Sequence, residues 1–365
     1  MSAQDLPSGL GRPWRGLDVL VTGHTGFKGG WLCLALDALG ARVHGLALDP
    51  PTTPSLFETA DVASRLARDT RGDIRDAALV ADAVRAARPS VVFHLAAQPL
   101  VRESYRDPIG TFASNVMGTA HVLDAVRQAE SVAAVVVVTT DKVYENEEWP
   151  HPYRERDRLG GHDPYSASKA ACEIATASLR ASFFGAGRHP ARIATARAGN
   201  VIGGGDFAPD RLVPDCLRAF ARGEPVRLRY PSAVRPWQHV LEPIAGYLAL
   251  AEHLLGADGE AFASAFNFGP DPAGDAAVGH VAERLAALWG EGASVARDTD
   301  GGHPHEAGTL RLDSTLARLR LGWRPRLDLD AALALTVDWH RAHARGEDVA
   351  ALTRTQIARF LECGG

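Results

Sequence analysis

The chain has 365 residues, of which 46% are hydrophobic and 23% are charged, and its formal net charge at pH 7 is -5. This length exceeds the size at which one hydrophobic core usually stops growing, so we expect two joined domains. The composition is that of an ordinary globular protein, and the net charge gives no electrostatic reason to bind nucleic acid or an anionic membrane. Residues 132–138 form the longest apolar run, too short for a membrane span, and residues 1–16 lack the apolar core of a signal peptide. A cytoplasmic protein is therefore expected.

The first half of the sequence alternates short β-branched runs with longer helical patterns, which is typical of a parallel sheet flanked by helices. We expect strands at residues 17–21, 42–48, 90–95, 133–139 and 191–196, a weak third strand leading into Gly72, and helices at residues 27–39, 76–87, 111–128 and 165–184. The predicted fold class is α/β, with a Rossmann-type, doubly wound parallel sheet.

Three glycines, Gly23, Gly26 and Gly29, lie at three-residue spacing between the first strand and the first helix. Glycine permits a tight turn and a close approach of the backbone to a pyrophosphate, whose charge is stabilised at a helix N-terminus. Glycine turns end many strands, but the strand, the helix and the βα alternation occur together here. The segment therefore predicts a dinucleotide site, with Thr25 and Phe27 as further contacts.

Asp49 lies at the end of the second predicted strand, where an acid would bind the adenosine ribose hydroxyls and repel a 2′-phosphate. This favours NAD over NADP as the cofactor. The alternative is that residues 49–51 are only a surface turn. The remaining predicted cofactor contacts are Asp73 and Ile74 beside adenine, Leu95, Ala96 and Ala97 after the fourth strand, and Ser114.

Tyr165 and Lys169 are four residues apart on a predicted helix and so share one face. A lysine ammonium close to a phenol favours its ionised form. Lowering a tyrosine pKa from about 10 to about 7 takes ~4 kcal/mol, similar to one charge about 4 Å away at an effective dielectric constant near 20. The pair predicts a base that works at neutral pH.

Asp141 and Lys142 follow Thr140 directly after the fifth predicted strand. Oxidation of a simple alcohol does not require a second acid and amine beside the tyrosine and lysine. These residues therefore predict a reaction with more than one proton transfer. The alternative is that Asp141 and Lys142 form only a salt bridge at the end of the strand.

The sequence changes after Asn200 to glycine- and proline-rich loops, where we expect a smaller C-terminal α/β substrate-binding domain. We predict helices at residues 211–222, 242–254, 277–288 and 329–344 and a strand at residues 265–268 that returns to the first domain. The predicted division is an N-terminal tail (1–16), an NAD-binding domain (17–199 and about 237–270) and a substrate-binding domain (200–236 and 271–365). Cys33, Cys172, Cys216 and Cys363 lack metal-ligand spacing, so we expect free thiols and no metal site.

The glycine spacing, the Tyr165/Lys169 pair and the long second half resemble the extended short-chain dehydrogenase/reductase family. Within it, residues 23–29, 140–146, 153–155, 159–166, 198–206, 210–212 and 235–240 resemble blocks of the nucleotide-sugar 4,6-dehydratases that act on CDP-glucose. The resemblance covers nearly all of residues 17–326. It implies a lyase that holds NAD and feeds deoxysugar biosynthesis for bacterial surface polysaccharides such as the lipopolysaccharide O-antigen.

The resemblance also implies residue roles. Tyr165 would take the proton of the sugar 4-hydroxyl as hydride leaves C4, Thr140 would bond the same oxygen, and Lys169 would bind the nicotinamide ribose. Asp141 would protonate the 6-hydroxyl as water leaves. Lys142 replaces a glutamate of the dTDP-glucose enzymes, and would either remove the C5 proton, steady an enolate or orient Asp141.

By position, the resemblance places Asn200, Arg211 and Arg235 at the substrate diphosphate, with His239 in the same block, although Arg211 alone could be a solvated surface residue. Gln98, Arg102 and Ser104 are expected near the sugar. Related functions remain open, namely a dehydratase or epimerase for a dTDP-, GDP- or UDP-sugar, and more remotely a non-catalytic dinucleotide-binding sensor or scaffold.

Helices of this family build a four-helix dimer interface, so the resemblance implies a homodimer or a tetramer made from it. The apolar residues expected there are Phe112, Val116, Val122, Leu123, Val126, Ile174, Ala175, Leu179 and Phe183. The competing interpretation is that these residues serve only the internal core.

Overall fold

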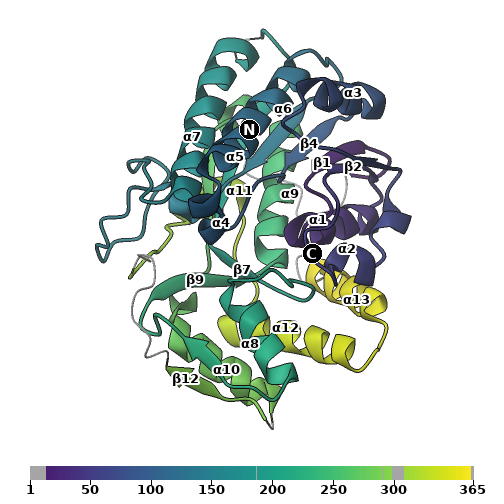
Figure 1. The fold of residues 1–365 in the computed structure, drawn as a ribbon. Helices are drawn as coiled ribbons and strands as arrows, with labels where there is room; N and C mark the ends of the chain where they lie inside the picture. Colours follow the sequence, from purple (N-terminus) through teal and green to yellow (C-terminus); the bar gives the residue numbers. More distant parts are fainter. Residues whose placement is uncertain (1–13, 186, 291, 298–307, 363–365) are drawn as a thin grey trace.

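Figure 1 shows the computed structural model of the chain, in which residues 14–185, 187–290, 292–297 and 308–362 are described. The main sheet contains β1 (Asp18–Thr22), β2 (Arg42–Ala47), β3 (Arg68–Arg71), β4 (Val91–His94), β5 (Ala134–Val138), β6 (Arg192–Ala198) and β10 (Ala265–Phe268). These strands are parallel and lie in the order β10-β6-β5-β4-β1-β2-β3. The predicted α/β fold is confirmed, and the returning strand β10 pairs with β6 as expected.

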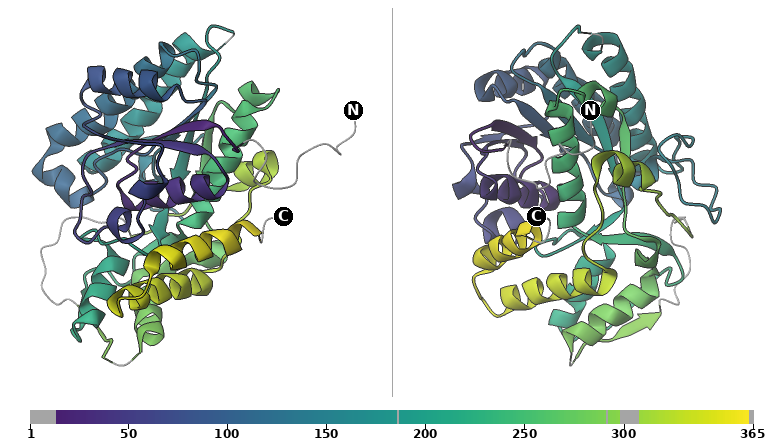
Figure 2. Two further views of the ribbon diagram at one scale, coloured as in Figure 1. Left: turned by 90° about the vertical axis from the view of Figure 1, so that its right-hand side faces the viewer. Right: turned by 180° about the vertical axis from the view of Figure 1, so that it is seen from behind.

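Helices cover both faces of the main sheet (Figure 2). On one face α1 (Phe27–Ala38) and α9 (Leu241–Leu255) share a core with α13 (Val349–Glu362), and on the other α3 (Ala77–Ala87) packs with α6 (Gly118–Arg127), beside α7 (Pro164–Leu179). Side chains of β1 alternate between these cores: Val19 and Val21 join the first, and Leu20 joins the second. All five residues of β5 are buried, as predicted for a central strand.

The strand order reverses between β1 and β4, since β2 follows on one side and β5 on the other. In open sheets of this kind, ligands bind outside the carboxyl ends of the strands at this point. The glycine loop after β1, residues 95–98 after β4 and residues 139–142 after β5 all meet there.

A smaller lobe lies below the main sheet in Figure 1. Its strands are β7 (Asn200–Ile202), β9 (Val234–His239) and β11 (Asp275–Ala277) in one sheet and β8 (Val226–Leu228) and β12 (Val295–Arg297) in a pair, with helices α8 (Leu212–Ala221), α10 (Val278–Trp289) and α12 (Leu329–Ala344). The three helices were predicted, but the five strands were not. Four of these strands have only three residues, which is shorter than a typical strand signal. β9 has six residues but contains Pro236, which argues against a strand.

The predicted domain boundary between residues 236 and 237 falls inside β9. The helix α13 follows the predicted closing helix and packs against α1 in the upper lobe. The division of the chain into an NAD-binding and a substrate-binding domain remains a prediction.

The predicted helix at 111–128 begins earlier and is interrupted. It consists of α5 (Pro108–Phe112), a π-helical turn (Ala113–Met117) and α6, and a second π-helical turn (Arg180–Phe184) extends α7. The short helices α2 (Leu56–Thr59), α4 (Val101–Arg106) and α11 (Thr315–Leu321) were not predicted.

Cys33, Cys172 and Cys216 are buried free thiols, and Cys363 lies outside the described residues, as do residues 1–13 of the predicted tail. Within the described residues, no helix is long and apolar enough to cross a membrane. The same part of the chain contains no group of three or more His, Cys, Asp or Glu side chains arranged to hold a metal ion.

Candidate active site

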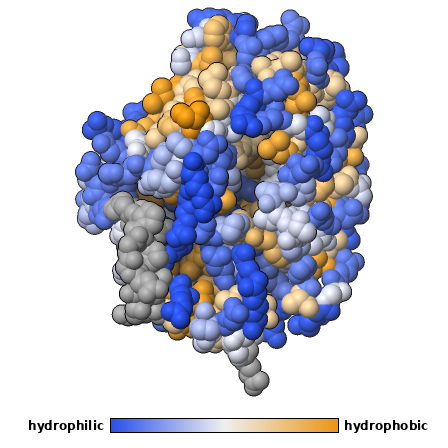
Figure 3. All heavy atoms as spheres, viewed as in Figure 1, coloured by the Kyte–Doolittle hydropathy of each residue, from blue (hydrophilic) through white to orange (hydrophobic). Residues whose placement is uncertain are grey.

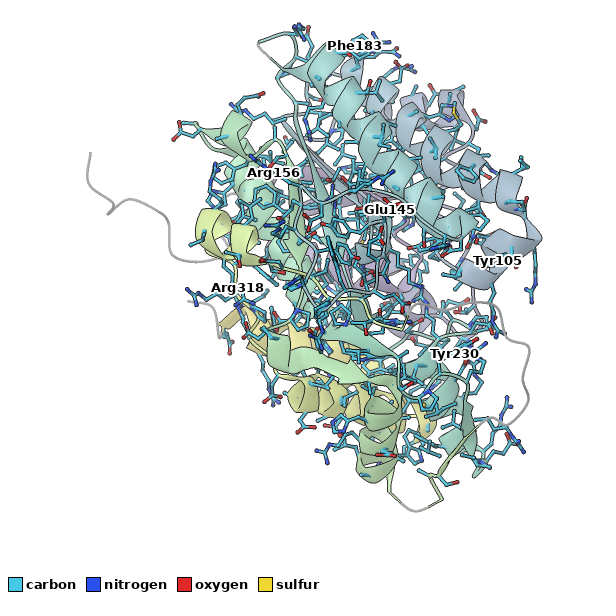
Figure 4. All side chains as sticks on the ribbon, turned by 90° about the vertical axis from the view of Figure 1, so that its left-hand side faces the viewer. Tyr105, Glu145, Arg156, Phe183, Tyr230 and Arg318 are labelled. Atoms are coloured by element: carbon cyan, nitrogen blue, oxygen red, sulfur yellow. The ribbon has the colours of Figure 1, made fainter. Side chains whose placement is uncertain are left out.

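A cavity of about 800 Å³ lies between the two lobes at the carboxyl edge of the main sheet. Figure 3 shows a hollow on this side of the molecule, lined by both polar and apolar side chains. Tyr105 of α4 and Tyr230, which follows β8, line the cavity from the upper and the lower lobe (Figure 4). The volume falls in the range of small-molecule and cofactor sites.

The glycine loop forms a cradle with no room for a side chain at Gly23 or Gly29. Gly23 has a φ of +77°, and a Cβ there would lie 2.7 Å from the Ala96 nitrogen. A Cβ on Gly29 would lie 2.1 Å from the Gly23 oxygen, and Gly26 is the N-cap of α1. The Thr25 hydroxyl donates to the Leu48 carbonyl at 2.9 Å, which ties the loop to the end of β2. Free backbone at a helix N-terminus suits a pyrophosphate, so the residues present fit a dinucleotide.

The acids predicted at the adenosine end also line the cavity. Asp49 is 90% exposed at its side chain, and Arg71 lies 3.5 Å away, although Arg71 bonds Asp69 more closely, at 2.8 Å. Asp73 pairs with Arg75, whose guanidinium lowers the pKa of the Asp73 carboxyl. Neither carboxylate is enclosed, so both are accessible from the cavity.

Tyr165 is buried on the first turn of α7, with its phenol near the Thr140 hydroxyl. Burial raises the pKa of Tyr165 to about 12, while the Thr140 hydroxyl and the charge of Arg211 act to lower it. The expectation of a pKa near 7 is therefore wrong for the protein alone. Desolvation of the buried phenol has a larger effect on this pKa than the nearby charges do.

Lys169 lies one turn along α7, where its ammonium donates to the Val138 carbonyl at 3.1 Å. Burial lowers the pKa of Lys169, and the neighbouring Cys172 and Glu173 oppose that change. The hydrogen bond fixes the amine at the end of β5, on the wall of the cavity.

Asp141 is 2% exposed, and burial raises the pKa of its carboxyl, against the opposing charge of Lys142 and the hydrogen bond from Thr140. Thr140 donates to Oδ1 at 2.9 Å, whereas Oδ2 has no hydrogen-bond partner among the described residues. A buried carboxyl that is more readily protonated than usual is suited to act as a general acid. Lys142 lies beside it, partly buried on the same wall.

Arginines from both lobes approach these groups. Arg211 pairs with Asp206 at 3.0 Å, and its charge acts on Tyr165. Arg235 on β9 is buried, and its charge opposes the rise in the pKa of Asp141 that burial causes. Arg102 on α4 pairs with Asp210 across the cleft at 2.9 Å. Arg211 is thus a residue of the cavity and not a solvated surface arginine.

Almost every predicted site residue lines this one cavity. The lining includes Gly23, Thr25, Gly26, Phe27, Asp49, Asp73, Ile74, Leu95, Ala96, Ala97, Gln98, Arg102, Ser114, Thr140, Asp141, Lys142, Tyr165, Lys169, Asn200, Arg211 and Arg235. Ser104 and His239 are outside it. The Ser104 hydroxyl donates to the Val101 carbonyl at 2.6 Å, and His239 is fully buried against Trp31, where burial lowers its pKa to about 3.

The polar residues at the site include some that were not predicted, among them Lys28 in the cavity lining and Asn115 outside it. Lys28 lies on the cavity wall, donates to the Tyr247 hydroxyl at 3.3 Å, and has its pKa lowered to about 7 by burial and by Arg211 and Lys169. Asn115, in the π-helical turn, donates to Ser168 of α7 and accepts from the Gln98 backbone. The position of Lys28 inside the glycine loop could have indicated that it belongs to the site. No pattern in the sequence indicates that Asn115 does.

Comparisons with known proteins agree with this geometry. A CDP-glucose 4,6-dehydratase of Salmonella typhimurium is 46% identical over 351 residues, which are 95% of this chain and 97% of the relative. A dTDP-glucose 4,6-dehydratase of Streptomyces griseus is 32% identical over 76% of this chain and 78% of the relative. A solved double mutant of the dTDP-glucose 4,6-dehydratase from Streptomyces venezuelae, with NAD bound, superposes with a TM-score of 0.73 at 26% identity, covering 91% of this chain and 99% of that one. The model of the NAD dependent epimerase/dehydratase family matches residues 19–265. The chain therefore belongs to the NAD dependent epimerase/dehydratase family.

Proposed function

We propose that this protein is a hydro-lyase that converts CDP-D-glucose to CDP-4-keto-6-deoxy-D-glucose with loss of water. The observation that carries the proposal is the meeting of two acid–base sets in one cavity: Tyr165 with Lys169, and Asp141 with Lys142. The choice of CDP-glucose rests on the 46% identity to the Salmonella dehydratase over 95% of the chain. A related dehydratase or epimerase for another nucleotide sugar is the alternative.

NAD would be held by the glycine cradle, with Asp49 at the adenosine ribose and Lys169 at the nicotinamide ribose. The chemistry that bound NAD supplies is hydride transfer from C4 of the sugar and back to C6. The cofactor therefore ends the cycle in its starting state.

For oxidation, Tyr165 takes the proton of the 4-hydroxyl while Thr140, whose hydroxyl acts to lower the pKa of the phenol, stabilises the same oxygen. The cations near the phenol offset part of the cost of ionising it in a buried position. Arg211 is one of them, held in place by Asp206.

For elimination, the 4-ketone acidifies the C5 proton, and its removal expels the 6-hydroxyl as water. Asp141 donates the proton to that hydroxyl, since its carboxyl is buried and has its pKa raised. Lys142 removes the C5 proton or stabilises the resulting enolate. Arg235 and Asn200 hold the substrate diphosphate, and Arg102 and Gln98 border the sugar.

Substrate labelled with deuterium at C4 tests this function. NAD-loaded enzyme should deliver the deuterium of CDP-[4-²H]glucose to C6 of the product, because hydride is removed and returned within one active site. Mass spectrometry and NMR of the product would locate the label. A product that lacks deuterium at C6 would overturn the mechanism, and faster turnover of a dTDP-, UDP- or GDP-sugar would overturn only the choice of substrate.

We also propose a cytoplasmic homodimer formed through the helical face that includes α5, the two π-helical turns and α7. Ile109, Phe112, Met117, Ile174 and Phe183 are exposed there, and Figure 4 shows Phe183 at the far end of this face. Val122, Leu123 and Val126, expected at the same interface, are instead fully buried in the internal core. The remaining exposed side chains still form an apolar stripe. Buried free thiols suit a reducing compartment.

Replacing one side chain of this stripe tests the assembly. Ile174 is 61% exposed, and Ile174→Asp should give monomers in sedimentation velocity experiments, because a buried unpaired carboxylate opposes association. Leu319→Asp is the matched control, since Leu319 is 78% exposed on α11, away from this face. A wild-type monomer, or a dimer that withstands Ile174→Asp, would contradict the proposal.

A further inference from the structure

A buried carboxylate that the proposed mechanism does not use lies directly behind the catalytic residues. Glu173 is one turn after Lys169 on α7, and its side chain is 4% exposed. It accepts three hydrogen bonds, from Thr139 Oγ1 at 2.5 Å, from Thr195 Oγ1 at 2.7 Å and from Arg197 Nη2 at 2.8 Å. Burial acts to raise the pKa of Glu173, but Arg197 and the two hydroxyls together hold it below its usual value. The carboxylate is therefore charged.

Thr139 is the link between this carboxylate and the chemistry. It directly precedes Thr140 and Asp141 and lines the cavity with them, and its hydroxyl donates to Glu173, which is not part of the cavity lining. A second bond joins the same two elements one turn earlier, from Lys169 to the Val138 carbonyl. The end of β5 is thus tied to α7 at two successive residues, Val138 and Thr139.

The two ties are not equivalent. Lys169 must also present its amine to the cavity, where the nicotinamide ribose would compete for its N–H groups. The Glu173 carboxylate is held on its other side by Thr195 and Arg197 of β6, so it is fixed whether or not the cavity is filled. Arg197 is itself anchored to the Tyr144 hydroxyl at 2.9 Å and to the Glu155 carbonyl at 3.0 Å.

Stability alone is a poor reason for this arrangement. Each partner of the Glu173–Arg197 pair is 4% exposed, and taking two charges out of water offsets most of their attraction. A well-packed apolar pair would serve the fold as well. What an apolar pair could not do is hold the Thr139 hydroxyl in one direction.

We propose that Glu173 is a positioning residue, which acts through Thr139 to keep Thr140 and Asp141 at a fixed place relative to Tyr165 and Lys169. This inference rests on the proposed function, because it concerns how oxidation and elimination come to act on one sugar. Displacement of a reacting group by about 1 Å can cost on the order of 100-fold in rate.

Two threonines bonded to the same carboxylate offer a matched test. Thr139→Val and Thr195→Val each remove one hydroxyl from Glu173 and keep the side-chain shape, but only Thr139 leads into the catalytic segment, and Thr195 is not part of the cavity wall. We expect Thr139→Val to lower kcat for CDP-glucose at least tenfold. The KM, the Kd for NAD and the unfolding midpoint of Thr139→Val should stay close to those of Thr195→Val. The kcat of Thr195→Val should remain within about twofold of that of the wild type.

A double-mutant cycle with Glu173→Gln identifies the route. If Thr139 acts through Glu173, adding Thr139→Val to Glu173→Gln should cost little more than Glu173→Gln alone. Should Glu173→Gln not fold because Arg197 loses its partner, Glu173→Gln/Arg197→Gln replaces it in the cycle. Equal kcat values for the two threonine variants, or fully additive losses in the cycle, would overturn the inference. A wild-type protein without activity on CDP-glucose would instead refute the proposed function.

Discussion

Tyr165→Phe should lower kcat by about 10²–10⁴-fold, because it removes the group that takes the proton of the 4-hydroxyl. Binding of NAD and CDP-glucose should persist, since the aromatic ring still fills its buried position. The fold should tolerate the change, because Thr140 keeps its hydrogen bond to Asp141 when the phenol oxygen is removed. Single-turnover reduction of NAD and calorimetric binding would measure the two effects separately.

The pH dependence of the same step provides a second measurement. Burial raises the pKa of Tyr165 to about 12, so the phenolate fraction, and with it the rate of NAD reduction, should rise with pH through the neutral range in wild type. Tyr165→Phe should abolish that rise. Tyr153→Phe is the control, because it removes a buried hydroxyl outside the cavity, bonded to Asn146 and the Glu147 backbone, and should affect stability but not the rate. Full turnover by Tyr165→Phe would refute the assignment of the base.

The strands of the main sheet could be predicted because each central one is an apolar, β-branched run. The strands of the small lobe could not be, since four of the five have only three residues and all owe their pairing to contacts with distant segments. Sequence periodicity carries no signal for β8, whose partner β12 lies almost seventy residues away in the chain.

Site residues could be predicted where a sequence motif assigns them to a particular strand, helix or loop. They could not be predicted where the direction of the side chain decides whether the residue reaches the cavity. Arg102 and Ser104 both follow the fourth strand and are expected near the sugar, but residues two apart on a helix face different directions, and α4 turns Ser104 away from the cavity. His239 shares a strand with Arg235, yet the end of β9 enters the core beside Trp31. The pKa of Tyr165 depends on burial, which no spacing of charged residues reveals.

Asp141→Asn should separate the two halves of the reaction. The asparagine keeps the side-chain shape and can still accept from Thr140, but it cannot donate a proton to the 6-hydroxyl, so overall turnover should fall by about 10²–10³-fold. Oxidation at C4 depends on Tyr165 and should continue. Mixing the variant with CDP-glucose should therefore build up the absorbance of NADH and a CDP-4-keto-glucose that retains its 6-hydroxyl, detectable after rapid quenching.

The same variant should be more stable than wild type at neutral pH. Burial raises the pKa of Asp141, so the folded protein binds this proton more tightly than the unfolded chain does. The carboxyl therefore destabilises the fold increasingly as pH rises above its unfolded pKa, and the cost is absent in acid. Asp141→Asn removes the unpaired buried charge, and its unfolding midpoint should exceed that of wild type by a margin that grows with pH.

Comparison of Asp141→Asn with Lys142→Met identifies the residue that removes the C5 proton. If Lys142 is the base, the ketone held by Asp141→Asn should exchange its C5 hydrogen with deuterated solvent, and Lys142→Met should form NADH without that exchange. If Asp141 itself moves the C5 proton, the exchange disappears in Asp141→Asn and persists in Lys142→Met. Equal loss of NADH formation and of elimination in Asp141→Asn would contradict the separation of roles, because the carboxyl would then be needed for oxidation as well.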